Sequence, residues 1–510
     1  MNRSRREILK LTAGSASALL IPAIESNCVH GRPQARLLRS RVPARPPFRE
    51  ELPLIPVVKP SKADSSTDYY DVTVQEGNIK ILPGLKTRVW GYNGIFPGPT
   101  IEATRGRCVT LRLRNSLSVP IVNHLHGGHT PPESDGYPTD LILPPGFVAS
   151  HMHDPMARIA NEWRVYTYTN QQRAATLWYH DHRMDFTAPQ VWHGLAGFYI
   201  IRDEEEKQIA LPRGDKEIPL MICDRSFNSD GTFLYPSLDA SLLQQPGVPP
   251  EYMGGVLGDV ILVNGAPWPR LEVANTKYRL RVLNASNARR YELALDPALG
   301  GTPSFIQIGS DGGLLESPVT HRSIRIAPAE RFDLIVDFSK YRIGSMVTLL
   351  NQADSGPTGQ IMRFNVARRE PDNTVIPTQL SRITFPNPGQ AVVTRVFNLS
   401  YRGAQGWTIN GKPYGPTRMD AKPKLDSTEI WRLETDFNHP LHLHLVHFQV
   451  LSHSGRPGPY DSGWKDTIDL GPGQTANILV RFSGHRGRYV FHCHNLEHED
   501  MSMMGNFEVI

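Results

Sequence analysis

The sequence predicts an all-β protein built from three consecutive β-sandwich domains. Short segments in which polar and apolar residues alternate are separated by turn-forming residues, and the 42 Gly and 43 Pro are scattered along the whole chain. This texture is typical of a turn-rich β protein. The length of 510 residues exceeds what one hydrophobic core usually supports, so two or three domains are expected.

An internal repeat sets the number of domains at three. An Asn-Gly turn occurs three times, at residues 93–94, 264–265 and 410–411. Each turn leads into a strand with period-two alternation, at residues 108–114, 278–282 and 429–433. The copies begin about 170 and about 150 residues apart, which is the size of one β-sandwich each. We therefore expect domains at residues 66–205, 206–375 and 376–510.

The first residues are similar to an export signal. Arg5 and Arg6 lie in a basic stretch, followed by a modest apolar segment at residues 11–23 that is rich in Ala, Ser and Gly. Twin-arginine (Tat) signals have this character and carry proteins that are already folded. We expect residues 1–28 to be this signal, with the cleavage site left open, and residues 29–65 to be an extended lead-in rich in Arg and Pro. The alternative, a short core helix, fits the short apolar segment less well. The export machinery would then be a partner of the chain. We expect the protein to be periplasmic, secreted or at the cell surface.

The formal net charge of +5 belongs to this leader. Residues 1–50 contain ten of the 55 Lys and Arg but three of the 50 Asp and Glu, so the remaining chain has 45 basic and 47 acidic residues. A near-neutral body gives no electrostatic reason to expect nucleic acid as a partner. No apolar run is long enough to span a bilayer. We expect a soluble monomer without a membrane span.

The four cysteines do not form a disulfide framework. Cys28 falls in the leader, while Cys108 and Cys223 lie in strand-like segments and are expected to be buried, with their pairing left open. Cys493 lies between two histidines, which points to metal binding instead.

Histidine pairs indicate where the metal lies. Among 19 His there are five His-x-His pairs, at residues 124/126, 151/153, 180/182, 442/444 and 492/494. Residues two apart on a strand project from the same face, and imidazole suits copper and zinc. Four pairs lie at matching ends of the first and third repeats, which argues against incidental surface histidines. The 151/153 pair is loop-like and is not counted. The middle repeat lacks such a pair near its end, so we expect it only to space the other two.

The last motif predicts a blue-copper site. Cys493, His498 and Met503 follow one another at intervals of five residues, and such a site takes two His, one Cys and a weak axial Met. His439 is the candidate for the second histidine, and Met504 competes with Met503. Strand pleating would direct Cys493 to one face and its two histidine neighbours to the other.

These motifs resemble the four copper motifs of multicopper oxidases. Leu125–Gly128 followed by Ser134–Pro138, Trp178–His182 and Ile261–Gly265 are similar to the spore-coat-type laccases of bacteria and to bilirubin oxidases. The resemblance covers about residues 65–510, and a suitable residue is present at every ligand position of the family. It implies three cupredoxin-like Greek-key β-sandwiches, with a copper-free second domain and a trinuclear cluster between the first and third.

The resemblance also implies four copper ions and their ligands. The type 1 copper would be held by His439, Cys493, His498 and Met503, and the type 2 copper by His124 and His442. One type 3 copper would be held by His126, His180 and His494, and the other by His182, His444 and His492.

The implied activity is that of an oxidoreductase. Four one-electron oxidations of phenolic, aminophenolic or bilirubin-type substrates would be coupled to the reduction of dioxygen to water, with the physiological reductant left open. An alternative is a cuprous or ferrous metallo-oxidase, but the 12 Met include no Met-rich insertion. A copper-free scaffold is a further alternative, and here no ligand is missing.

Two acidic residues match positions that assist dioxygen reduction in the spore-coat relatives. They are Glu499, next to His498, and Asp135, eleven residues after His124. A carboxylate near bound oxygen species can relay protons, and it can also simply orient a histidine. Both roles place the acid beside the cluster.

Overall fold

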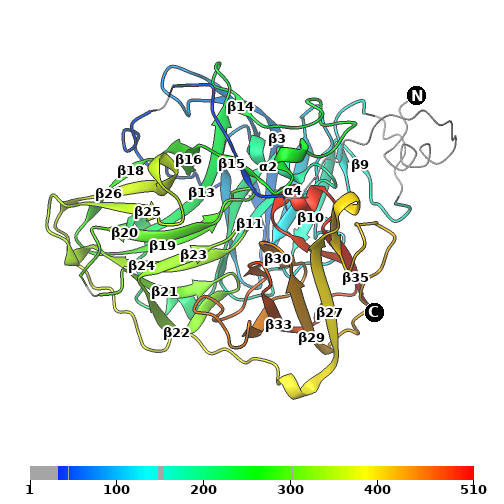
Figure 1. Ribbon diagram of the computed structural model, residues 1–510. Helices are drawn as coiled ribbons and strands as arrows, with labels where there is room; N and C mark the ends of the chain where they lie inside the picture. The colour runs from blue at the N-terminus through cyan, green and yellow to red at the C-terminus, as the bar shows by residue number, and fades with distance from the viewer. Residues whose placement is uncertain (1–32, 44, 148–153, 301) are drawn as a thin grey trace, which may run out of the picture. The chain divides into compact units, whose positions relative to one another are not determined.

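The computed structural model describes residues 33–43, 45–147, 154–300 and 302–510. The predicted all-β class is confirmed, since strands dominate the described residues (Figure 1). The α-helices there are short: α2 (Thr187–His193), α3 (Glu204–Lys207) and α4 (Leu496–Asp500). The predicted export signal and the His151/His153 pair lie outside the described residues. Of the helices described, none combines the length and the apolar character that crossing a membrane requires.

The first two large sheets come from the range 62–202. One has the order β10 (Trp163–Tyr168), β6 (Cys108–Asn115), β3 (Thr67–Ile79) and β2 (Lys62–Ala63), with β4 (Thr87–Tyr92) also paired to β3. The other has the order β5 (Gly98–Thr104), β12 (Ala196–Arg202), β11 (Ala175–Asp181) and β7 (Asn123–His126).

The next two sheets come from the range 217–368. The larger has the order β17 (Ala266–Pro267), β16 (Val260–Val263), β13 (Glu217–Phe227), β19 (Lys277–Asn284), β24 (Arg331–Asp337), β21 (Phe305–Ser310) and β22 (Gly313–His321), with β14 (Phe233–Leu234) on β13. The smaller has the order β18 (Arg270–Ala274), β26 (Gln360–Arg368), β25 (Met346–Asn351), β20 (Tyr291–Asp296) and β23 (Ser323–Ile326).

The last two sheets come from the range 391–509. One has the order β28 (Trp407–Ile409), β27 (Ala391–Tyr401), β29 (Thr428–Thr435), β33 (Thr475–Arg481) and β31 (Phe448–His453). The other has the order β32 (Thr467–Leu470), β30 (His439–Leu443), β34 (Gly487–Cys493) and β35 (Met504–Val509). Each of the six sheets thus draws on a single predicted domain range, extended only by β2 at its start. The exact domain boundaries stay a prediction.

Strands that carry the histidine motifs are buried on both faces. β11 reads Ala-Thr-Leu-Trp-Tyr-His-Asp, and every one of its residues is buried. β30, with the sequence His-Pro-Leu-His-Leu, is buried throughout as well. One face of such a strand packs in its own domain and the other meets a neighbouring domain, which removes the polar-apolar alternation of a half-exposed strand. The histidines are therefore held in close-packed surroundings.

The described part of the lead-in lies along the first and second domains. Its strand β1 (Arg36–Leu38) pairs in parallel with β15 (Val256–Gly258). Farther along, Glu51 bridges to Arg270 and Val57 to Thr100. The segment thus binds to both domains. A separate two-stranded sheet joins β8 (Ile142–Leu143) and β9 (Ala160–Asn161).

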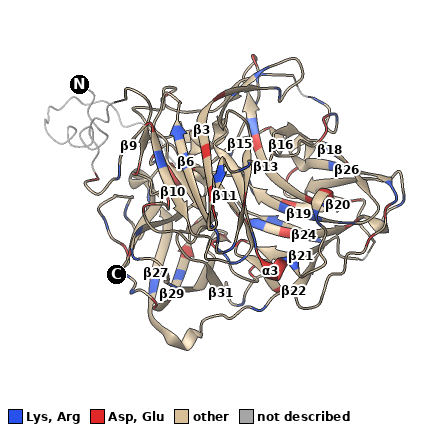
Figure 2. Cartoon of the chain, turned by 180° about the vertical axis from the view of Figure 1, so that it is seen from behind, with Lys and Arg blue, Asp and Glu red and all other residues tan. Residues whose placement is uncertain are grey.

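Buried charged and polar contacts tie helix α3 to the second domain and helix α4 to the first. Arg279 and Arg281 on β19 each lie 3.0 Å from the Glu206 carboxylate on α3, and Figure 2 shows the acidic α3 beside the basic positions of β19. Helix α4, which follows the copper motif, packs against α2 of the first domain. The Asp500 carboxylate accepts hydrogen bonds of 2.8 Å from the backbone N–H groups of Thr187 and Ala188. The contacts of α4 with α2 fix the third domain on the first.

The question of cysteine pairing is settled for the described chain. Cys108, Cys223 and Cys493 all carry free thiols. Cys223 is buried, as expected, whereas Cys108 is half-buried at the start of β6.

Candidate metal centre

Strand pairing aligns the histidines of each domain on one face. In the first domain His180 on β11 lies directly opposite His124 on β7, and the neighbouring pair is Trp178 with His126. In the third domain His442 on β30 lies opposite His492 on β34. Directly opposed residues of antiparallel strands point to the same face, so each domain presents a block of imidazoles.

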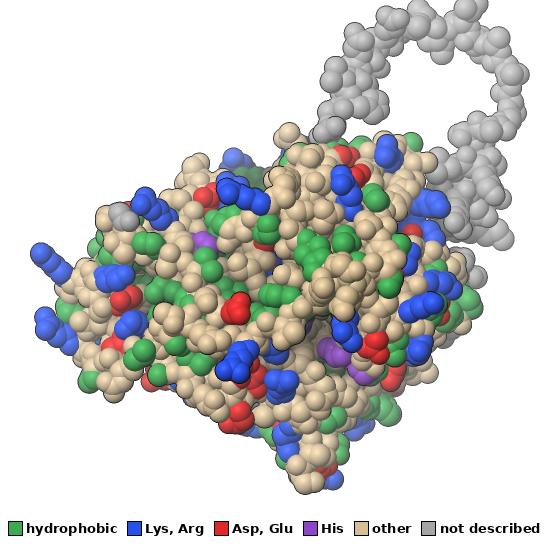
Figure 3. All heavy atoms as spheres, turned by 90° about the horizontal axis from the view of Figure 1, so that it is seen from below, with side chains coloured by type: hydrophobic (Ala, Val, Ile, Leu, Met, Phe, Trp, Pro, Cys, Tyr) green, Lys and Arg blue, Asp and Glu red, His purple; other side chains and the backbone are tan. Residues whose placement is uncertain are grey.

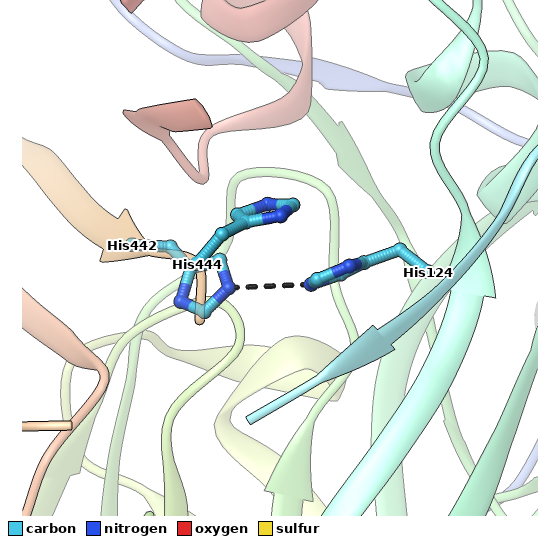
Figure 4. Close-up of side chains that lie close together, drawn as sticks. All are labelled: His124, His442 and His444. Atoms are coloured by element: carbon cyan, nitrogen blue, oxygen red, sulfur yellow. Dashed lines mark hydrogen bonds between the residues drawn. The ribbon is translucent and has the colours of Figure 1, made fainter. Parts of the chain in front are cut away.

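The two blocks face each other and form one cluster. We call it the histidine cluster, and its members are His124, His126, His180, His182, His442, His444, His492 and His494. The Nε2 atoms of His124 and His442 are 3.4 Å apart across the domain boundary, as the dashed line in Figure 4 shows. Nε2 of His444 lies 3.3 Å from Nε2 of His182 and 3.3 Å from Nε2 of His492. Eight of the eleven predicted copper-binding side chains other than Met503 therefore converge here.

His494 lies beside its predicted partners but falls outside the tightest groups of donor atoms. One donor atom each of His124, His126 and His180 lie within 4.8 Å of one another. The ring of His494 lies 5.1 Å from that of His126 and 5.3 Å from that of His180, between centroids. Neither of its ring nitrogens has a hydrogen-bond partner, and Nδ1 of His126 and Nε2 of His180 are likewise buried and unpartnered. Buried polar atoms normally have a partner, and a metal ion bound among these three histidines would provide one.

The outer nitrogens of the rings fix their tautomers. Nδ1 of His124 donates to the Asp135 carbonyl (2.6 Å), and Nδ1 of His442 to the Asp466 carbonyl (2.9 Å). Nδ1 of His180 likewise donates to the Asp181 carbonyl (2.7 Å). Since a carbonyl oxygen only accepts, the proton sits on Nδ1 and the lone pair of Nε2 faces the centre.

Burial favours the uncharged form of five rings of the histidine cluster. It lowers the pKa well below the ordinary value for these five, with neighbouring histidines adding to the effect in most cases: His124, His126, His180, His444 and His494. A neutral imidazole is the form that binds a metal ion. On the face drawn in Figure 3 few histidine side chains (purple) are visible, in keeping with their burial. The donor set fits copper, which imidazole ligands suit.

A second site contains the predicted sulfur ligand. We call His439, Cys493 and His498 the cysteine site. Sγ of Cys493 lies 3.4 Å from Nδ1 of His439 and 3.6 Å from Nδ1 of His498, and the two nitrogens are 3.2 Å apart. Burial raises the pKa of the Cys493 thiol. A bound cation is what would make the thiolate stable there, so this donor set also fits a soft-ligand copper site.

Strand register separates the two candidate methionines. In the β34–β35 pair, Met504 lies opposite His492, so it points to the same face as His492 and packs with Val490. Met503 precedes it and belongs to the buried cluster that contains Cys493. The Met503 carbonyl also accepts a 3.1 Å hydrogen bond from the Cys493 N–H. The register thus favours Met503 over Met504 on the cysteine side.

Both predicted acids touch the outer side of the histidine cluster. Glu499 places Oε1 3.1 Å from Nδ1 of His182 and Oε2 3.0 Å from Nδ1 of His492. Oδ2 of Asp135 accepts a 2.8 Å hydrogen bond from Nδ1 of His444. Burial, with a smaller effect of Asp140, raises the pKa of Asp135 well above its ordinary value. For Glu499 burial acts in the same direction, but the adjacent histidine nitrogens hold the pKa well below its ordinary value.

Three residues of the sites were missed by sequence reasoning. Asp466 contacts Nε2 of His126 at 3.1 Å, yet it lies outside every histidine motif. Trp407 stacks on His498, with ring centroids 3.6 Å apart. Asp436 lies 3.4 Å from Nε2 of His439. It could have been found, since a metal-binding histidine commonly donates its other ring N–H to a carboxylate and Asp436 is near in sequence.

Comparisons with known proteins agree with this geometry. Two family models described as multicopper oxidase match residues 73–206 and 383–510. The laccase of Bacillus subtilis is 38% identical over 521 residues, which cover 91% of this chain and 98% of that protein. The bilirubin oxidase of Albifimbria verrucaria is 33% identical, over 98% of this chain and 89% of that protein.

A solved structure extends the agreement to the fold. The laccase of Pediococcus acidilactici superposes with a TM-score of 0.79 at 32% identity, over 93% of this chain and 96% of that chain. The predicted family and the predicted cupredoxin-like all-β fold are thereby confirmed. The chain belongs to the multicopper oxidase family and is a laccase-like copper oxidoreductase that uses dioxygen as acceptor.

Proposed function

We propose that the chain binds four copper ions and oxidises phenolic, aminophenolic or bilirubin-type compounds one electron at a time. The type 1 copper is assigned to the cysteine site with Met503 as axial ligand, and the type 2 copper to His124 and His442. The two type 3 coppers are assigned to His126, His180 and His494, and to His182, His444 and His492. Similarity to proteins named laccase and bilirubin oxidase supports this substrate class.

One observation carries the proposal. Cys493 faces the cysteine site, while His492 and His494 on either side of it belong to the histidine cluster. When bound, copper supplies one-electron redox chemistry at both sites. The protein's part is to connect the two sites through the backbone of one residue and to hold the ligand rings at fixed positions. Close packing around the buried rings excludes bulk water.

Glu499 and Asp135 are proposed to handle protons for dioxygen reduction. Each carboxylate lies within hydrogen-bonding distance of the outer nitrogen of a cluster histidine. A positioned carboxylate at that distance can pass protons inward, which reduction of dioxygen to water requires. The competing role is to hold the rings in place, and the two roles predict different losses on substitution.

Export by the twin-arginine route is proposed from the leader, with a periplasmic, secreted or cell-surface destination. Arg5 and Arg6 followed by a short apolar stretch support it. A monomer is proposed, and light scattering on the purified protein tests it: a mass of two or more chains would contradict it.

Steady-state turnover decides the substrate class. The copper-loaded protein is supplied with a substituted phenol, an aminophenol, bilirubin, Cu(I) or Fe(II) in parallel, and oxygen uptake is followed. Turnover of the organic compounds with the highest kcat/KM is expected. Preference for Cu(I) or Fe(II) would identify a metallo-oxidase instead. If the protein takes up no copper, a copper-free scaffold is the alternative that remains.

A further inference from the structure

The middle domain does more than space the other two. Arg331, the first residue of β24, is fully buried, and its guanidinium reaches both neighbouring domains. Nε donates to the carbonyl of Thr176 (3.0 Å) on β11, the strand that carries His180. Nη1 and Nη2 donate to the two oxygens of Asp466 in the third domain, at 2.7 and 2.5 Å. The expectation that this domain is only a spacer is therefore incomplete.

All five N–H groups of this guanidinium are paired. Besides Thr176 and Asp466, Nη1 donates to the carbonyl of Ala329 (3.0 Å) and Nη2 to that of Asp311 (3.1 Å). The backbone N–H of Arg331 donates to the Asp311 carboxylate at 2.8 Å. A guanidinium offers five donors in a rigid fork, so this arrangement leaves it a single orientation.

Asp466, which Arg331 holds in place, contacts two histidines of the cluster. Its Oδ1 lies 3.1 Å from Nε2 of His126, and its carbonyl accepts from Nδ1 of His442. Because Nε2 of His126 faces a carboxylate, it carries the proton, and the unpartnered Nδ1 keeps its lone pair for the centre. Both Asp466 oxygens are engaged by the Arg331 fork and by Thr467, which suits an orienting group rather than a metal ligand.

The backbone next to His126 leaves room for the ion pair of Arg331 and Asp466. Gly127 has a φ of 85°, and a Cβ added there would lie 2.8 Å from both Nη2 of Arg331 and Oδ2 of Asp466. Any larger residue would push the pair away from His126 as well as strain the turn. The absence of a side chain at position 127 thus allows the contact between Arg331 and Asp466 next to the cluster.

We propose that Arg331 is a positioning residue for the copper ions of the histidine cluster, acting through Asp466 on His126 and His442. The inference rests on the proposed function, since it takes His126 to be a copper ligand. Lysine cannot reproduce it, because an ammonium is a point charge that does not hold two carboxylate oxygens at fixed positions.

Copper titration of the apo-protein tests the role, with copper ions alone as the probe. Arg331→Lys is expected to bind copper in the histidine cluster roughly 10- to 100-fold more weakly, as loss of an outer partner of a ligand typically does. The blue absorption of the cysteine site should keep its wild-type intensity. Electron paramagnetic resonance separates the two kinds of copper, and thermal unfolding of the apo-protein measures stability independently.

Arg279→Lys is the matched control. Arg279 is equally buried in the same domain and also forks onto a carboxylate, with Nε 2.8 Å and Nη2 2.5 Å from the oxygens of Asp333. Arg279 belongs instead to the group of charged residues that contains Glu206 on α3. This variant should unfold at a lower temperature than the wild type yet bind copper in the histidine cluster with wild-type affinity.

The outcomes separate the two proposals. Wild-type protein that takes up no copper in the histidine cluster would refute the proposed function. If the wild type binds copper and Arg331→Lys binds it equally well with only a lower melting temperature, Arg331 has no positioning role.

Should Arg331→Lys fail to fold, Asp466→Asn answers the same question. Its amide N–H would be set against either Nε2 of His126 or Nη2 of Arg331, depending on its orientation. The same loss of affinity is therefore expected, and wild-type affinity would overturn the proposal. Where both variants fold, the double variant should be no weaker than the worse single one, because they act in one network.

Discussion

Replacing Glu499 by Gln distinguishes proton delivery from simple positioning. The carboxylate contacts His182 with one oxygen and His492 with the other, at 3.1 and 3.0 Å. Gln keeps one oxygen as an acceptor but presents an N–H₂ group at the other position. One of the two contacts is therefore retained, and the other sets a donor against the ring nitrogen.

The two roles predict losses of different kinds. Loss of a hydrogen bond to a charged group costs about 1.5–3 kcal/mol, which is roughly a 10- to 150-fold change in an equilibrium constant. If Glu499 only orients the rings, this loss appears as weaker copper retention. If it delivers protons, copper content stays near the wild-type value and turnover falls by about two to four orders of magnitude.

Anaerobic stopped-flow measurements locate the affected step after copper content has been checked. Bleaching of the blue band reports electron uptake from the substrate, and reoxidation by dioxygen reports the second half of the cycle. We expect fast bleaching and slow reoxidation. Bleaching that slows in proportion to turnover, while reoxidation stays fast, would refute a role in proton delivery to the cluster.

Glu497→Gln is the control on the same helix. The Glu497 carboxylate accepts from Tyr235 (3.0 Å), Asn287 (2.9 Å) and the N–H of Val256 (3.1 Å). Burial raises its pKa to about 7, so an uncharged amide resembles the form already present near neutral pH. Turnover and reoxidation close to the wild-type rates are expected.

Four further variants address the remaining assignments. Cys493→Ser should abolish both the blue colour and the activity while thermal unfolding shows a folded protein, because the thiolate–copper bond is the chromophore; a blue, active variant would exclude Cys493 as ligand. Met503→Leu should raise the reduction potential of the blue site in a redox titration, since it removes a weak donor that favours Cu(II), whereas Met504→Leu should not; the reverse result would exchange their roles. Arg5→Lys combined with Arg6→Lys should leave the protein in the cytoplasm on cell fractionation, because an export receptor reads guanidinium geometry, and normal export of this variant would contradict the twin-arginine assignment.

The ligand histidines could be predicted because their signal is local. His-x-His on a strand fixes which face the rings share. The first pair lies within β7, and the other three begin in β11, β30 and β34 and end one residue past each strand. Spacing alone could not choose between Met503 and Met504, since the choice depends on how β35 pairs with β34.

The supporting residues gave no such local signal. Asp466 meets His126 from 340 residues away, and Arg331 meets Asp466 across 135 residues. Those contacts exist only after three domains have packed together. A charged residue destined for complete burial looks like any surface charge until its partner is known.

Strand β1 marks the point beyond which a cut in the chain would disturb the second domain. Arg36 donates its backbone N–H to the Gly255 carbonyl at 2.8 Å, and Ser40 bonds to Asp259. The adjoining Gly254 carbonyl accepts from Asn495, the residue that caps helix α4 beside the cysteine site. A protease that cut after residue 36 would remove the partner of β15 and loosen the segment that touches the copper loop. If a leader is removed, as proposed above, cleavage at or before Arg36 would therefore keep β1 paired with β15.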